Sequence, residues 1–569
     1  MNKRMKLKVM SLIMLVVMCA SLFVGCGDKK EEQVKRVGGY YNVEGYPICN
    51  DPIRIKVSGV NDYLCEWNDT LMVKTVQEKL GIKMDCAPYT RDAWAQQYAL
   101  MLSTGDIPDM VISASMNRSQ VDGDGESGFW LDFSQYLDLM PNMAAFMKKH
   151  PDWAAGIKNA DGKIYSLTRY QVSETNLVYT QIYYDKTLTD AAGVEKIETV
   201  DDFYNALKLC KAKYPDKIPL GMTPNKSPGY RADMIIRSAF GVYSTQNTYM
   251  LAADKKDQIG LLDIGDNYRQ SLIYENKLYK EKLLDNNCFS ITSEQYKENI
   301  KNGKYIFYTD TTSLIMSNED QKAYNSGTYK VIDKYEPLFC LTSDIQPEKA
   351  YLKISPVLDQ ARIFVNADSQ YAEAICRLID YFFTEEGILL SSEGIEGETY
   401  DLVDDGYGNT LYDHSQYWDS EAYNTTAEWV MNDVAMHDAL TFEWARDLSY
   451  LNDKTKDDLK KLAADPSYIN FWEAKKMLRY KETIDVEYES LLPFAYTTEE
   501  TNERTTLRAD IVNYVTKMKS SFMTGEVDPN DDKAWNTYVN QVKKMGYDRL
   551  MEIEQAAYDR LQKTLSEAK

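Results

Sequence analysis

The residues that could do chemistry together are two carboxylates, Glu396 and Glu398, separated by one glycine. Glycoside hydrolases use two carboxyl groups, one as acid and one as base or nucleophile, held at a defined separation across the scissile bond. Spacing in the sequence does not establish that separation, and with 87 Asp and Glu residues such pairs arise by chance. No G-x-S-x-G, HExxH or Cys/His pattern accompanies the pair. We therefore expect no enzyme, with an extracellular glycoside hydrolase as the alternative.

The histidines and cysteines do not indicate a metal site. His150, His414 and His437 are the only histidines of the sequence, and they stand far apart without the spacing of metal ligands. No CxxC motif occurs, and the cysteines after Cys26 are scattered singly, which is typical of small buried apolar residues. We expect no metal ion and no cofactor.

The first residues predict export and a lipid anchor. Basic residues precede an apolar stretch, 9–24, which is shorter than the ~20 residues that span a bilayer, and this order is typical of a secretory signal peptide. The run 22–26 resembles a lipobox, in which the peptide is cut before Cys26 and the thiol takes a lipid, although Phe23 stands where Leu is usual. We predict a signal peptide (1–25), a palmitate-type lipid on Cys26, a polar tether (26–39), and a place at the extracellular face of the cell membrane.

Composition limits the partners and suggests the size of the fold. The formal net charge of −22 would repel phosphate polymers, so no nucleic-acid partner is expected. A chain of 569 residues exceeds what one hydrophobic core usually serves, which favours two large lobes. The 43 Tyr and 9 Trp residues supply flat amphipathic rings, which mostly fill cores but also bind sugars.

Hydrophobic periodicity predicts a parallel sheet near the start of the folded body. Strands are expected at 53–60, 82–86 and 110–112, with helices at 69–80 and 93–103 between them. This β-α-β-α-β order is typical of an α/β fold, in which ligands bind at the carboxyl ends of the strands.

The rest of the chain alternates strands and helices and then becomes helical. We expect strands at 177–184 and 303–308, mostly helices after Tyr371, and an amphipathic terminal helix at 548–565.

Several segments, taken in order, carry a resemblance to a known family. They are 103–109, 161–167, 183–203, 277–281, 299–304, 394–400 and, most closely, 522–526, 535–539, 545–547 and 554–560. Together they resemble the family 1 extracellular solute-binding lipoproteins that feed bacterial ABC importers, of the carbohydrate type.

The resemblance implies a two-lobed α/β fold of the type II periplasmic-binding-protein class, with a helix-rich C-terminal part. A sugar or oligosaccharide would be held between the lobes and passed to the permease subunits of an ABC importer by a monomeric protein. The N-terminal lobe would comprise 40–170 and 308–366, and the C-terminal lobe 171–307 and 367–569. A peptide cargo, or service to a membrane sensor, stays open as an alternative.

A sugar site needs aromatic planes and a few fixed polar groups. Trp67, Asn68 and Asp69 lie in the exit loop of the first predicted strand, and Ser113 and Ser115 follow the third. The alternative for Trp67 is core packing, and for the serines an ordinary turn.

Further candidates come from the second half of the chain. Glu398 and Tyr400 belong to the segment that the resemblance places in a loop facing the cleft, so that Trp67 and Tyr400 would grip the ligand from opposite lobes. Arg231 could donate to two hydroxyls, with a surface ion pair as the alternative. Trp444 lies in the helical part, where core packing is the alternative. Residues 558–560 are expected to dock the last helix on its own lobe.

Overall fold

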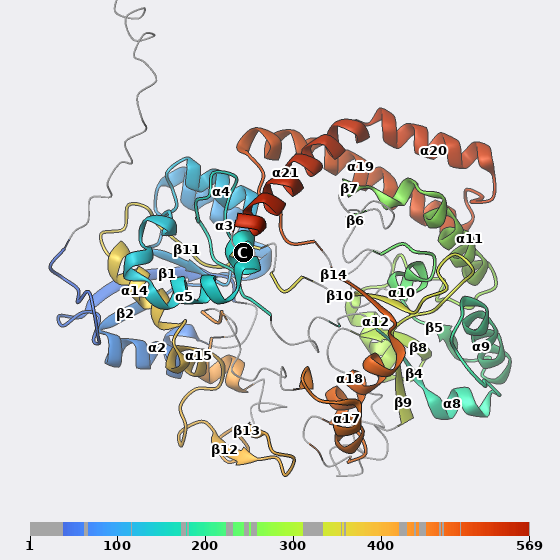
Figure 1. The fold of residues 1–569 in the computed structure, drawn as a ribbon, viewed down its shortest axis with the longest axis horizontal. Helices are drawn as coiled ribbons and strands as arrows, with labels where there is room; N and C mark the ends of the chain where they lie inside the picture. The colour runs from blue at the N-terminus through green and yellow to red at the C-terminus, as the bar shows by residue number, and fades with distance from the viewer. Residues whose placement is uncertain are drawn as a thin grey trace, which may run out of the picture. The chain divides into compact units, whose positions relative to one another are not determined.

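The computed structural model describes most of the chain after the tether (Figure 1). Its described residues are 38–567 except 62–65, 115, 172–177, 179–180, 224–231, 244–249, 252–258, 311–333, 354, 358–359, 420–428, 437–439, 443–450, 466–467, 469–470 and 490. The predicted signal peptide and Cys26 lie outside them. Within this part of the chain, no helix has the length and apolarity needed to cross a bilayer.

The first sheet confirms the predicted β-α-β-α-β order. Its strand order is β11-β3-β1-β2, with β1 parallel to β2 and β3 and with β11 antiparallel to β3. The strands are β1 (Ile53–Gly59), β2 (Ile82–Cys86), β3 (Met110–Ile112) and β11 (Phe364–Val365). The crossovers contain η1 (Trp67–Asp69), α2 (Leu71–Thr75), the π-helical turn η2 (Val76–Leu80) and α3 (Arg91–Thr104). Alternate residues of β2 are buried, as the period-2 pattern predicts.

Further helices pack around this sheet. They are α4 (Arg118–Glu126), η3 (Phe133–Gln135), η4 (Leu137–Leu139), α5 (Pro141–Lys149), α6 (Pro151–Gly156), α14 (Ala372–Tyr381) and α15 (Glu385–Ser392). Helix α14 contacts α5 and η4, and Glu386 of α15 forms an ion pair with Lys79 of η2. We call the sheet with α2 to α6, α14 and α15 the first body.

The second sheet has the order β5-β8-β4-β9, with β4 antiparallel to both of its neighbours. Its strands are β5 (Ile218–Leu220), β8 (Tyr305–Asp310), β4 (Gln181–Asp185) and β9 (Tyr335–Leu338). Helices α8 (Lys186–Ala191), α9 (Val200–Lys213), α10 (Ala232–Ser238), α11 (Asp266–Lys280), η6 (Leu262–Ile264) and α12 (Ser293–Lys301) accompany it. With α17 (Lys456–Leu462) and α18 (Phe471–Thr483), whose Trp472 contacts Tyr183 of β4, they form the second body.

The packing differs from the predicted division of the chain into lobes. Strand β9 lies within 308–366 but pairs with β4 of the second body. Helix α14 lies within 367–569 but packs on the first body, where Arg377 donates to the carbonyl of Gly45 and Tyr40 donates to Glu373. Pairing and burial between segments distant in sequence decide these memberships, and local periodicity does not report them.

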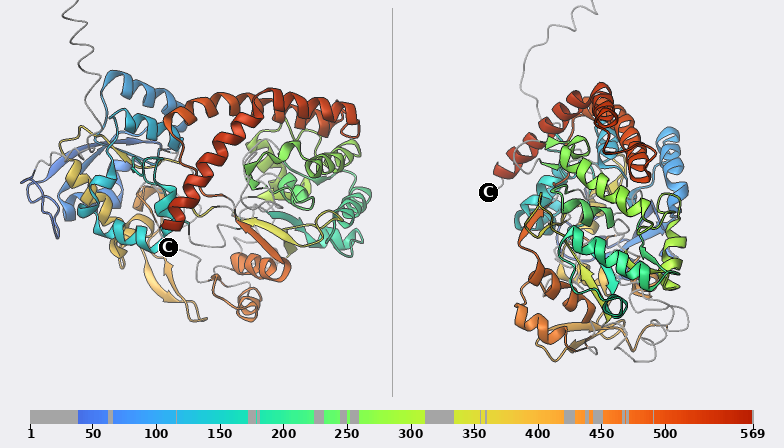
Figure 2. Two further views of the ribbon diagram at one scale, coloured as in Figure 1. Left: turned by 45° about the horizontal axis from the view of Figure 1, so that its top comes forward. Right: turned by 90° about the vertical axis from the view of Figure 1, so that its right-hand side faces the viewer.

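Smaller elements complete the described chain (Figures 1 and 2). They are the parallel pair β10 (Ala350–Lys353) and β14 (Val486–Glu489), the hairpin β12 (Asp401–Asp404) and β13 (Thr410–Asp413), the pair β6 (Met250–Leu251) and β7 (Ile259–Gly260), the π-helical turn η8 (Val430–Val434), and α19 (Thr498–Thr524), α20 (Asp532–Lys544) and α21 (Tyr547–Glu567). Helix α21 confirms the predicted terminal helix. Helix α19 packs on α11, so these helices extend the core of the second body.

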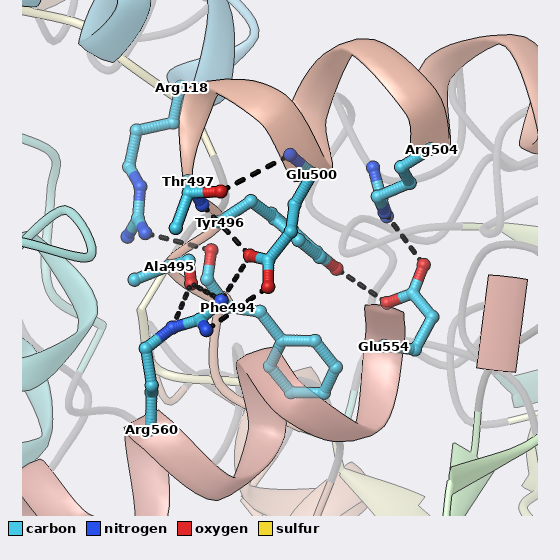
Figure 3. Close-up of polar contacts among 9 residues, drawn as sticks. All are labelled: Arg118, Phe494, Ala495, Tyr496, Thr497, Glu500, Arg504, Glu554 and Arg560. Carbon is cyan, nitrogen blue, oxygen red and sulfur yellow. Dashed lines mark hydrogen bonds and ion pairs between the residues drawn. The ribbon is translucent and has the colours of Figure 1, made fainter. Parts of the chain in front are cut away.

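Residues 491–497, which we call the strap, lead into α19 and receive hydrogen bonds from α4 and α21 (Figure 3). Arg118 of α4 donates from Nη2 to the carbonyl of Phe494 at 2.9 Å. Arg560 of α21 donates from Nε and Nη2 to the next carbonyl, that of Ala495, at 3.2 and 3.0 Å. Two arginines far apart in the sequence thus satisfy consecutive carbonyls of one segment.

Side chains of the strap add further contacts in the same place (Figure 3). The hydroxyl of Tyr496 donates to Glu554 at 2.5 Å, and Arg504 donates to the other oxygen of that carboxylate at 2.7 Å. Thr497 and Glu500 form a capping box that starts α19. An apolar cluster of Ala155, Ile259, Phe494, Ala557, Tyr558 and Leu561 lies beside them. Residues 558–560 do dock the last helix, through Tyr558 and Arg560, but not on its own lobe alone as predicted, because the cluster includes Ala155 of α6 in the first body.

We predict that Arg118→Met lowers the free energy of unfolding by about 2 kcal/mol or more, because it removes a charged donor from buried carbonyls. The side chain of Arg118 is 3% exposed, and it also lies 3.6 Å from Asp122. Urea unfolding of the purified soluble protein measures the loss. Arg549→Met is the matched control, since Arg549 pairs with Glu503 and Glu552 on the exposed face of α21 and such pairs contribute little. Equal losses in the two variants would contradict the prediction.

Candidate ligand-binding site

The exit of β1 is built around a glycine and a buried indole. Gly59 has φ +154°, and a Cβ there would lie 1.8 Å from the carbonyl oxygen of Ile112 and 3.3 Å from the ring of Trp67. Only glycine therefore allows β3 and the ring to approach this strand end so closely. Trp67 is 2% exposed, so in this structure its ring serves packing.

Asn68 is exposed, but both ends of its amide bond the backbone of Cys86. Nδ2 donates to the carbonyl of Cys86, and Oδ1 accepts from the N–H of Cys86, both at 2.9 Å. The side chain of Asn68 thus pairs with the N–H and the C=O of Cys86, as a residue of a neighbouring strand would. Asp69 is exposed, and its carbonyl accepts from Lys74 at 2.5 Å. Its carboxylate belongs to an exposed residue of this loop.

A hollow of about 460 Å³ lies beside β2. Its lining carries both signs of charge and no aromatic ring: Asn68, Val73, Lys74, Gln77, Glu78, Lys83, Met84, Asp85, Cys86 and Ala87. Burial, together with the charge of Asp85, raises the pKa of the Cys86 thiol to about 12, so it stays protonated near neutral pH. Without an aromatic plane, this hollow does not have the lining expected for a sugar.

Ser113 follows β3 with φ +55°, an uncommon conformation for a residue with a side chain. It is 9% exposed. The next residues are tied to the segment before β11, since the N–H of Ala114 donates to Arg362 and that of Met116 donates to Ala361. These bonds hold the backbone at the carboxyl end of β3 in its uncommon conformation. Such conformations occur often at ligand-binding and active sites.

The segment 394–400 forms a compact loop. Gly394 and Gly397 have φ +98° and +76°. The N–H of Ile395 donates to the hydroxyl of Thr399 at 2.8 Å, and that hydroxyl lies 2.9 Å from the carbonyl of Glu393. Glu396 and Glu398 are exposed on this loop.

Tyr400 ends the loop and is buried, with 3% of its surface exposed. Its ring centroid lies 5.1 Å from that of Tyr412 and 5.9 Å from that of His414. Burial, with Tyr412 and the charges of Glu396 and Glu393, raises the pKa of Tyr400 to about 12. Its phenol therefore stays neutral near pH 7. Its buried ring packs between the loop and the rings of Tyr412 and His414.

His414 is a residue of this region that the sequence patterns missed. Its Nδ1 lies 2.7 Å from the carbonyl oxygen of Thr399, and its Nε2 lies 2.8 Å from Oε2 of Glu393. His414 and Glu393 are both buried. A search for metal ligands by spacing dismisses this histidine, and no other sequence signal marks it. Among the described residues no cluster of three or more His, Cys, Asp or Glu could hold a metal ion.

The loop 394–400 and the exit of β1 belong to the same body. Trp429 and Val430 pack with Leu71 of α2, and the ring of His414 lies 6.1 Å from Trp429. The predicted division placed Trp67 and Tyr400 on opposite lobes. In this structure both residues lie on the first body. Ser115, Arg231 and Trp444 lie outside the described residues.

Residues 72–395 match the family described as bacterial extracellular solute-binding protein. The chain belongs to this family. The fructooligosaccharide ABC transporter substrate-binding protein FusA of Streptococcus pneumoniae serotype 4 is 22% identical over 266 residues, which are 44% of this chain and 48% of FusA. Lipoprotein LipO of Bacillus subtilis is 20% identical over 349 residues, 58% of this chain and 64% of LipO. This solute-binding protein thus spans less than two thirds of the length of either relative.

Solved structures of similar proteins cover more of the chain. Alginate-binding protein AlgQ2 without calcium ion has a TM-score of 0.66 at 17% identity, covering 92% of this chain and 100% of AlgQ2. FusA of S. pneumoniae in complex with kestose has a TM-score of 0.67 at 17% identity, covering 90% of this chain and 99% of FusA. The solute-binding protein therefore has the two-lobed α/β fold of type II solute-binding proteins, as the resemblance implied.

We predict that Trp67→Ala destabilises the protein by about 3 to 5 kcal/mol, because it opens a cavity at a packed strand end. Thermal unfolding measures this loss, and Leu100→Ala, whose side chain is 51% exposed, is the control. Ligand affinity is measured on the same variant. A normally stable Trp67→Ala protein would contradict the packing role, and a loss of affinity in that protein would place the ring in the ligand site.

Proposed function

We propose that this protein is an extracellular, lipid-anchored binding protein that captures a sugar or oligosaccharide and delivers it to an ABC importer permease. The observation that carries the proposal is the agreement in fold over 92% and 90% of the chain with proteins named for binding alginate and crystallised with kestose. The name of FusA gives an ABC transporter as its partner. A monomer suffices for this task.

The ligand contacts that we propose are polar groups at the strand ends and on the loop 394–400. Glu398 is exposed and can accept hydrogen bonds from two sugar hydroxyls, while Asp69 and Ser113 lie at the exits of β1 and β3. Asn68, Trp67 and Tyr400 would then hold these groups in place, because their own side chains are engaged or buried. Ser115, Arg231 and Trp444 complete the proposed set.

Capture without turnover fits these residues better than hydrolysis does. Glu396 and Glu398 stand on one tight loop and are both exposed. A glycosidase instead holds its two carboxyl groups on opposite sides of the scissile bond and keeps its acid in a protected setting. The hydrolase remains the alternative that the test below addresses.

We predict that the soluble protein, without residues 1–26, binds an oligosaccharide and returns it intact. Calorimetry against kestose, longer fructo-oligosaccharides, alginate oligomers and peptides identifies the class of ligand, and chromatography of the released ligand detects turnover. Glu398→Gln should weaken affinity about tenfold, because one charge-assisted hydrogen bond is lost. Glu44→Gln, at another exposed carboxylate, should bind as the wild type does. Shortened sugars that disappear in Glu398→Gln would favour the hydrolase, and binding of peptides alone would refute the sugar proposal.

The anchor part of the proposal rests on the lipobox-like run before Cys26 and on the name of LipO, a lipoprotein. We predict that Cys26→Ala abolishes lipid labelling and moves the protein from the membrane fraction to the medium or to a soluble precursor. Fractionation with a labelled fatty acid measures both effects, and Cys49→Ala, at a buried cysteine of the body, is the control. A variant that is still lipid-labelled at the membrane would refute the anchor.

A further inference from the structure

The loop 394–400 is closed by short-range bonds of its own. The N–H of Gly397 donates to the carbonyl of Tyr400 at 2.8 Å, and the N–H of Thr399 donates to Ile395 at 2.9 Å. Gly394 and Gly397 leave this backbone with high conformational freedom when it is unfolded. A hydrogen bond from outside the loop would reduce that freedom further.

His414 supplies a support from outside the loop. A backbone carbonyl accepts and cannot donate, so the 2.7 Å contact between Nδ1 and the Thr399 oxygen requires that Nδ1 carries the hydrogen. This bond reaches the residue directly after Glu398. It comes from the residue that follows β13, and not from the loop itself.

The opposite side of the imidazole is fixed as well. Nε2 lies 2.8 Å from Oε2 of Glu393, the residue directly before the loop. Both side chains are buried, so the ring has little room to turn. One imidazole thus joins the residue before the loop to the residue next to its end.

Aromatic packing keeps the ring at this place. The centroid of the His414 ring lies 5.9 Å from that of Tyr400 and 6.1 Å from that of Trp429. Trp429 belongs to the cluster that includes Leu71 of α2. Through this packing the loop is attached to the first body. The exits of β1 and β3, where the other proposed ligand contacts lie, belong to the same body.

We propose that His414 is a positioning residue for ligand binding, which fixes the loop 394–400 through Thr399 so that Glu398 meets the ligand in a defined direction. This inference rests on the proposed function, since it assigns Glu398 to the ligand. His414 itself does not contact the ligand.

Two substitutions separate the two bonds of the imidazole. In His414→Asn, the side-chain amide nitrogen takes the place of Nδ1 and can still donate to Thr399, but it does not reach Glu393. In His414→Gln, the amide nitrogen takes the place of Nε2 and can still donate to Glu393, but the bond to Thr399 is lost. Both variants replace the same buried imidazole ring with an amide. If His414 served packing alone, the two variants would therefore be affected alike.

Two measurements are made on the soluble protein and its variants. Hydrogen exchange of the amides of Gly397 and Thr399, without ligand, reports how firmly the loop is held. Calorimetry with kestose, or with the sugar of the panel that the wild type binds most tightly, reports affinity. We expect His414→Gln to exchange about tenfold faster and to bind about tenfold more weakly, and His414→Asn to stay within about threefold of the wild type in both, since one hydrogen bond differs.

Glu393→Gln keeps the proposal testable if His414→Gln does not fold. A glutamine at this position can still meet Nε2, and the bond from Nδ1 to Thr399 is untouched, so affinity within about threefold of the wild type is expected. A loss as large as that expected for His414→Gln would overturn the proposal.

Other outcomes also decide the matter. Equal effects in His414→Asn and His414→Gln, unchanged exchange in His414→Gln, or faster exchange with unchanged affinity would each overturn the positioning role. If the wild type binds no sugar in the panel, the proposed function fails, whereas the exchange measurement still decides whether His414 holds the loop.

Discussion

The structure depends on how two consecutive carbonyls of the strap 491–497, those of Phe494 and Ala495, are satisfied. A buried carbonyl without a donor costs free energy, and here two consecutive carbonyls receive the guanidinium groups of Arg118 and Arg560 (Figure 3). The first comes from α4 of the first body and the second from the last helix of the chain. Because both donors are needed at one place, the strap determines where α19 and α21 can lie.

Each of these two arginines also lies close to a carboxylate. Arg560 pairs with Glu500, and Arg118 lies 3.6 Å from Asp122. The same solution recurs between α10 and α11, where Arg237 lies 3.1 Å from Glu275. Burial alone lowers the pKa of Arg237, but Glu275 and the neighbouring acidic groups outweigh it and raise that pKa well above its ordinary value. The Arg560–Glu500 pair joins α21 to α19, and the Arg237–Glu275 pair joins α10 to α11.

The candidate site follows the same logic on a smaller scale. Its loops are held by side chains that replace missing backbone partners, as Asn68 does for the end of β2 and as His414 does for the loop that carries Glu398. Rings that look like ligand platforms in the sequence, such as Trp67 and Tyr400, are buried and support these loops. An indole near a strand exit is therefore weak evidence of contact with a ligand, because such a ring can also pack against a strand end, as Trp67 does beside Gly59.

What the sequence determined by itself is local or rests on order along the chain: the first three strands and their helices, the terminal helix, and the resemblance to solute-binding proteins. Each is encoded by a period of two or 3.6 residues, or by a motif whose members are neighbours. Only the tertiary structure decided that β9 joins the second sheet, that α14 packs on the first body, and that His414 meets Thr399 and Glu393. These contacts join residues that are distant in the sequence, so no local periodicity predicts them. They form because buried polar groups need hydrogen-bond partners and apolar faces need to be covered, whichever segments supply them.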